Sequence, residues 1–101
     1  MIERLRDDTL NLMKIPGLSG HEDRVRDYIK EAVKKIGLTP NIDKLGNLTI
    51  TFPGTSPRVM LFTHMDQLGL VVRKIEDDGY LRFERVGGVP EKILLGQTIS
   101  V

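Results

Sequence analysis

His64 and Asp66 are the two residues whose types and spacing suggest chemistry. A neutral imidazole is a good ligand for zinc or cobalt. A metal-bound His usually donates its other ring N–H to a nearby acceptor, and a carboxylate two residues away can be that acceptor. A His beside an Asp more often forms only a local hydrogen bond. The spacing alone therefore leaves a metal ligand and a local contact both open.

The stretch before His64 predicts a strand that would position it. Residues 58–63 form a nearly continuous apolar run, which is typical of a strand covered on both faces. In open α/β sheets, ligands bind at the carboxyl ends of the strands. His64 follows such an end directly.

Two helices and a further strand are expected upstream. Apolar spacing predicts helices near 3–14 and 20–36, the second with a capping box over 19–22 and a stop at Gly37. Alternating apolar residues over 47–52 predict a strand with one buried face, after a turn near Gly46. We expect both helices to pack on a sheet that includes 47–52 and 58–63.

After Gly69 the pattern is that of a β meander. Strands are predicted over 70–75, 80–86 and 97–101, with a hairpin turn at 77–79 between the first two. Exposed strand edges in such a segment favour association with another chain.

Composition excludes several classes of protein. The 15 basic and 14 acidic residues give a net charge of +1, with no basic stripe of the kind that binds nucleic acid. No apolar stretch approaches the ~20 residues of a membrane helix, and the amphipathic start does not resemble a signal peptide. Cysteine is absent, which excludes disulfides and thiolate metal sites and predicts a reducing, cytoplasmic location.

A family resemblance adds to this interpretation. Residues 61–69 (LFTHMDQLG) resemble the first metal-site motif of the glutamyl aminopeptidase family, which includes the tetrahedral (TET) and deblocking aminopeptidases. Similar stretches, in the family's order, are IPGLSGHE at 15–22, DKLGNL at 43–48, DGYLRF at 78–83, VGG at 86–88 and LGQ at 95–97. Together they span nearly the whole chain.

The resemblance implies a fold, a metal site and an activity. The fold would be α/β: residues 1–69 would form the N-terminal part of a phosphorylase/hydrolase-like α/β sandwich, and 70–101 the first strands of an inserted, here incomplete, β-barrel assembly domain. The complete subunit would be a homo-oligomeric metalloaminopeptidase that removes N-terminal residues from peptides. Two divalent ions, zinc or cobalt, would hold a water that a Glu activates.

Two site roles carry over from the family's motif. His64 would bind one metal ion, and Asp66 would orient His64. The other ligands and the general base come from later in the family's chain, so this segment alone is predicted to be inactive.

Two other functions stay open at this point. One is a non-catalytic, truncated interaction or assembly module that pairs through its exposed strands. A distant third is an endoglucanase, a label that some family members have carried. Glycoside hydrolysis needs two suitably spaced carboxylates, and no such pair is identifiable in this sequence.

Overall fold

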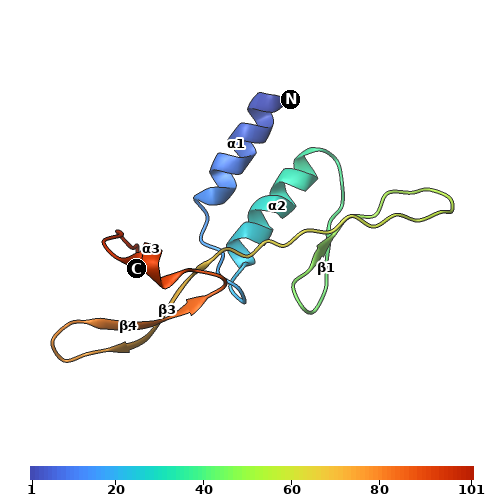
Figure 1. The fold of residues 1–101 in the computed structure, drawn as a ribbon. Helices are drawn as coiled ribbons and strands as arrows, with labels where there is room; N and C mark the ends of the chain where they lie inside the picture. Colours follow the sequence, from blue (N-terminus) through green and yellow to red (C-terminus); the bar gives the residue numbers. More distant parts are fainter. The chain divides into compact units, whose positions relative to one another are not determined.

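Two amphipathic helices begin the chain, α1 (Ile2–Met13) and α2 (Asp23–Lys35), in the computed structural model, which describes residues 1–101 (Figure 1). Both predicted helices are therefore present. In α2 two Lys side chains occupy the last turn, where they favour the helix dipole. The chain leaves α2 at Gly37, as predicted, with its N–H donating to the Lys34 carbonyl at 2.9 Å. No helix is long and apolar enough to cross a bilayer.

The predicted capping box at the start of α2 is wrong. The N-cap residue is Glu22, and no side chain caps the helix. The Glu22 carboxylate accepts instead from the Gly20 N–H at 2.7 Å. The Leu18 carbonyl accepts from the His21 N–H at 2.7 Å, so a turn separates Ser19 from the helix. Ser19 thus precedes the helix by too many residues to cap it.

A short antiparallel hairpin follows α2. It pairs β1 (Asn41–Ile42) with β2 (Leu48–Thr49) around a tight turn at Gly46. The φ of Gly46 is +87°, a conformation that residues with a side chain rarely adopt. The predicted strand over 47–52 is correct only at its first residues, because β2 ends at Thr49.

The predicted strand over 58–63 is wrong for this chain. These residues are extended but belong to no strand, and Phe62 is 91% exposed. A strand requires neighbours to accept and donate its backbone hydrogen bonds, and no other segment pairs with this run. The expected packing of both helices on a common sheet is therefore also wrong. Val25 of α2 is instead the one large apolar side chain that is buried, at 3% exposure.

The second hairpin agrees with the sequence patterns. β3 (Gly69–Ile75) pairs antiparallel with β4 (Leu81–Val86) around the predicted turn at 77–79, with a bulge between Val72 and Lys74. The Glu76 carboxylate bonds to both Lys74 and Arg82, which holds the pKa of Glu76 below its ordinary value.

The last part of the chain differs from the prediction. The expected strand over 97–101 is absent, and a short helix that the sequence patterns did not predict, α3 (Glu91–Leu94), follows Pro90.

The chain divides into two compact units, Met1–Asp66 and Gln67–Val101. The first holds both long helices and the β1–β2 hairpin, and the second holds the β3–β4 hairpin and α3. The fold class is α/β with two small sheets, as the sequence predicted at that level. The assignment of 1–69 and 70–101 to a catalytic and a β-barrel domain stays a prediction.

Candidate functional site

His64 and Asp66 lie in contact at the end of the extended run. His64 Nδ1 is 2.9 Å from Asp66 Oδ1 and 3.1 Å from the Asp66 carbonyl oxygen. A carboxylate and a carbonyl can only accept, so Nδ1 must carry the hydrogen. In the neutral ring this leaves the lone pair on Nε2, the nitrogen that faces away from Asp66.

The exposure of the two side chains suits this division of roles. The His64 side chain is 83% exposed, so Nε2 is open to a ligand, whereas the Asp66 side chain is 40% exposed. A carboxylate that accepts from one ring nitrogen fixes both the tautomer and the ring orientation. The predicted contact between the two residues is thus present. The metal-binding role is a separate claim, because a purely local hydrogen bond would have the same geometry.

His64 and Asp66 do not form a complete metal centre in these 101 residues. No group of three or more His, Cys, Asp or Glu side chains is arranged to hold an ion. The donor set fits a metal in part: one imidazole nitrogen is free, and its partner nitrogen is held by a carboxylate. Zinc sites usually take at least three protein ligands, so His64 can supply only one of them.

A second carboxylate, that of Asp43, organises the β1–β2 turn. The sequence patterns did not predict a role for this side chain. Its oxygens accept from the side-chain N–H of Asn47 at 2.8 Å and from the backbone N–H groups of Leu45 and Asn47 at 2.9 Å. The Asn47 side chain, followed by these backbone groups, holds the pKa of Asp43 below its ordinary value. An Asp three residues before Gly-Asn is a local signal for such a turn.

The same turn is tied to α2 by Arg26. Its guanidinium donates to the Gly46 carbonyl at 3.2 Å and also binds the Asp23 carboxylate. The Arg26 side chain is only 16% exposed, and a Cβ on Gly46 would meet its Nη1. Asp43 therefore fixes the shape of the turn, and Arg26 fixes the turn on α2.

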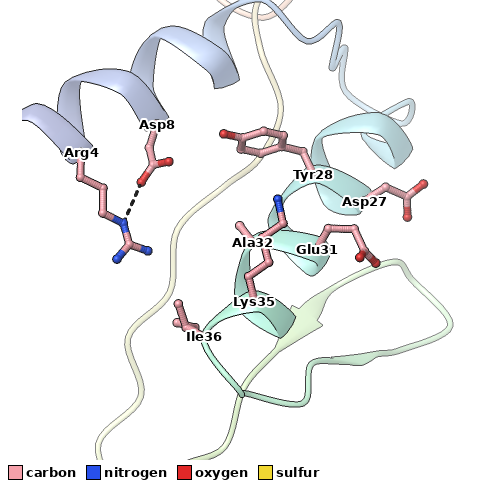
Figure 2. Close-up of a pocket in the computed structure, with 8 residues that line it drawn as sticks. All are labelled: Arg4, Asp8, Asp27, Tyr28, Glu31, Ala32, Lys35 and Ile36. Carbon is pink, nitrogen blue, oxygen red and sulfur yellow. Dashed lines mark ion pairs between the residues drawn. The ribbon is translucent and has the colours of Figure 1, made fainter.

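A groove lined mainly by charged and polar side chains lies between α1 and α2 (Figure 2). Its lining consists of Arg4, Asp8, Asp27, Tyr28, Glu31, Ala32, Lys35 and Ile36. Arg4 pairs with Asp8 at 3.6 Å, the contact drawn in Figure 2, and Lys34 pairs with Glu31 at 2.9 Å. The groove contains no His and no carboxylate that is buried, so we assign it no chemistry.

Comparisons with known proteins point to one group of peptidases. Residues 46–101, which include His64 and Asp66, match the family described as M42 glutamyl aminopeptidase. The chain is 42% identical over 89 residues to a lysyl aminopeptidase of Pyrococcus furiosus, covering 87% of this chain and 26% of that relative. It is 34% identical over 100 residues to a glutamyl aminopeptidase of Lactococcus lactis subsp. cremoris, covering 96% of this chain and 28% of that relative.

A solved structure agrees with these relatives. The chain is 34% identical to a chain described as "3-D structure of PhTET1-12s, dodecamer in the asymmetric unit", with a TM-score of 0.76 over 83% of this chain and 26% of that one. The chain spans about a quarter of the length of the proteins that it matches.

Proposed function

Because this chain belongs to the M42 glutamyl aminopeptidase family, we propose that it is the N-terminal part of a metal-dependent aminopeptidase subunit that removes N-terminal residues from peptides. The observation that carries the proposal is the contact between His64 Nδ1 and Asp66, which leaves Nε2 free in an exposed position. The family match spans both residues, and the relatives' names support the activity.

Each residue has a distinct role in this proposal. His64 binds a divalent ion through Nε2, and Asp66 accepts the Nδ1 hydrogen and so holds the ring in that tautomer. Divalent ions in such a site polarise the scissile carbonyl and lower the pKa of a bound water. Asp66 acts in this proposal through His64, because its Oδ1 accepts the Nδ1 hydrogen.

We assign two divalent ions to the complete subunit, with zinc or cobalt as the favoured metals. Imidazole nitrogen suits both metals, and the chain has no cysteine to offer a thiolate. Since these residues supply one ligand, the remaining ligands and the Glu base would come from chain beyond the matched quarter. On this proposal the 101 residues alone are inactive.

The wider properties of the complete protein follow the same proposal. The sandwich and β-barrel domains would be completed by further chain, and the subunits would form a homo-oligomer. The solved relative is described as a dodecamer, which supports assembly of this kind. A cysteine-free chain supports a cytoplasmic location, and the near-neutral charge gives no support for a nucleic-acid partner.

The test is substitution of His64 in the complete gene product, with His21 as the matched control. The chain has two His residues, and both side chains are exposed. We expect His64→Ala to lose bound metal, measured by elemental analysis after dialysis, and to lose hydrolysis of an aminoacyl-p-nitroanilide. His21→Ala should keep both. Asp66→Asn should bind metal about 10–100-fold more weakly, as expected for a partner of a ligating His.

Unchanged metal content together with unchanged hydrolysis in His64→Ala would refute the assignment. Loss of hydrolysis in His21→Ala to the same extent would also refute it, since a general defect would then explain both results.

A non-catalytic assembly module is the second candidate, and the edges of the β3–β4 hairpin favour it. Each strand pairs with only one neighbour, so the outer edge of each is open to another chain. Sedimentation of the 101-residue chain separates the candidates. If the chain is a monomer at all concentrations, the assembly module is refuted. If it forms a stable dimer, and the protein isolated from its source is also 101 residues long, the assembly module is favoured.

A further inference from the structure

Gly17 lies between Val25 and the backbone of Met65, the residue between the two site residues. A Cβ placed on Gly17 would lie 2.5 Å from Val25 Cγ2 and 3.7 Å from the carbonyl oxygen of Met65. Gly17 is buried, and Val25 is 3% exposed. Three segments that are far apart in sequence therefore come together here: the linker after α1, the first turn of α2, and the His64–Asp66 segment.

The contact leaves no space for a side chain at position 17. Carbon atoms 2.5 Å apart overlap strongly, so a methyl group on Gly17 would displace either Val25 or the linker that carries Gly17, and the linker holds Gly17 beside Met65. The φ of Gly17 is not positive, so backbone conformation is not the reason for a glycine at this position. The close approach to Val25 is the reason.

The contact among Gly17, Val25 and the Met65 carbonyl is the buried part of a site whose metal-binding side chain is exposed. The His64 side chain is 83% exposed, and the residues before it in 51–63 are exposed throughout. Met65 is half-buried, and its carbonyl group lies beside Gly17. The Met65 backbone is therefore the point at which the His64–Asp66 segment meets a buried residue of the same unit.

We propose that Gly17 and Val25 are positioning residues for the metal ligand. The bare Cα of Gly17 lies against Val25 on one side and beside the Met65 carbonyl on the other, and this fixes the place from which His64 presents Nε2. The inference rests on the proposed role of His64 as a ligand. Neither Gly17 nor Val25 touches the metal or the substrate.

The structure suggests a pair of substitutions that should compensate for each other. Gly17→Ala alone introduces the overlap with Val25 Cγ2. Val25→Ala removes that methyl group and leaves its Cβ 3.7 Å from the new Cβ, an ordinary van der Waals contact. The double variant should therefore fit where Gly17→Ala does not.

The experiment measures the equilibrium affinity of the complete gene product for Zn²⁺ by competition with a chelator. We expect Gly17→Ala to weaken binding roughly tenfold, the lower end of the effect of changes around a ligating His. The double variant should return to within about threefold of the wild-type affinity, a non-additive result expected of residues in contact. The signal of the His64 Nδ1 hydrogen in the metal-free protein should shift in Gly17→Ala and return in the double variant.

Gly54→Ala is the matched control. No heavy atom lies within 4 Å of a Cβ on Gly54, and its φ is not positive. This variant should bind Zn²⁺ like the wild type. If any Gly→Ala change weakened binding, Gly17→Ala and Gly54→Ala would both lose affinity, and the loss in Gly17→Ala would not support a positioning role.

The outcomes separate this inference from the proposed function. If His64→Ala leaves the Zn²⁺ affinity unchanged, His64 is not a ligand and both fail. If His64→Ala abolishes binding but Gly17→Ala binds normally, or the double variant shows no recovery, only the positioning role is overturned. Should Gly17→Ala fail to fold, Val25→Ala alone decides: its affinity should fall several-fold, and an unchanged affinity overturns the role.

Discussion

Residues 17–49 and residues 51–63 lie in the same unit, yet their side chains have very different surroundings. In the first stretch, Val25 is buried, and Arg26 bonds to the Gly46 carbonyl across twenty residues of sequence. In the second, every residue is exposed, although Val59, Met60, Leu61 and Phe62 form one of the most apolar runs in the chain. Hydrophobicity alone does not bury a segment.

The difference lies in the partners that each stretch requires. Helix α2 satisfies its own backbone, and the β1–β2 hairpin pairs with itself, so one glycine and one arginine are enough to join them. An isolated extended run cannot pair its own backbone groups, because its N–H and C=O groups need flanking strands. The chain covers only 26% of the lysyl aminopeptidase that it matches, so that relative contains much additional sequence.

Val25→Ala should have the largest effect on the stability of the 101-residue chain. Removing two buried methyl groups loses about 2 kcal/mol of unfolding free energy, from transfer and from the cavity left behind. Chemical denaturation followed by the helical circular dichroism signal measures the loss. Leu5→Ala is a control, because Leu5 lies on a helix but is mostly exposed. If Val25→Ala and Leu5→Ala lost the same unfolding free energy, the burial of Val25 would not explain its contribution to stability.

The sequence predicted the elements whose partners are close in the chain. Helical spacing located α1 and α2, and the turn at 77–79 between two alternating segments located the β3–β4 hairpin. The sequence-based prediction failed where a local pattern is compatible with two different structures. Ser19 and Glu22 have the spacing of a capping box, but the turn closed by Leu18 and His21 places Ser19 outside the helix. The apolar run at 58–63 has the composition of a central strand but lacks neighbours.

The candidate site was predictable to a similar extent. The H-x-D spacing gave the contact between His64 and Asp66, because two residues on an extended backbone bring the side chains within reach. It could not give the contact of Gly17 with Val25 and Met65, which joins three distant segments. A single glycine in a linker after a helix is most simply explained as a helix terminator, and its close approach to Val25 is visible only in the folded chain.

The β1–β2 turn should respond to acid through Asp43, with a smaller effect than Val25→Ala. Hydrogen bonds from Asn47 lower the pKa of Asp43 in the folded chain relative to the unfolded chain. The stabilisation is therefore complete above the unfolded pKa of about 3.9 and is lost as the pH falls through the lower, folded value. The chemical shift of the Asn47 backbone N–H should follow this titration below about pH 4.

Asp43→Asn is the control for the acid response. An Asn side chain can still accept from the turn, but it does not titrate, so the Asn47 signal should be flat across the same pH range. The same acid midpoint in the wild type and in Asp43→Asn would assign the response to another group and refute this account of the turn.

Phe62→Ala should have the smallest effect in the 101-residue chain. The side chain is 91% exposed, so its truncation should change the unfolding free energy by no more than about 0.5 kcal/mol. A loss of about 3–5 kcal/mol, as for a buried Phe, would contradict the exposed position. The same substitution in the complete gene product then asks a separate question. A loss of that larger size there, with none in the short chain, would mean that chain beyond these residues covers the run. The different burial of residues 17–49 and 51–63 would then come from the absence of the strands that pair with 51–63, and not from a difference in their sequences.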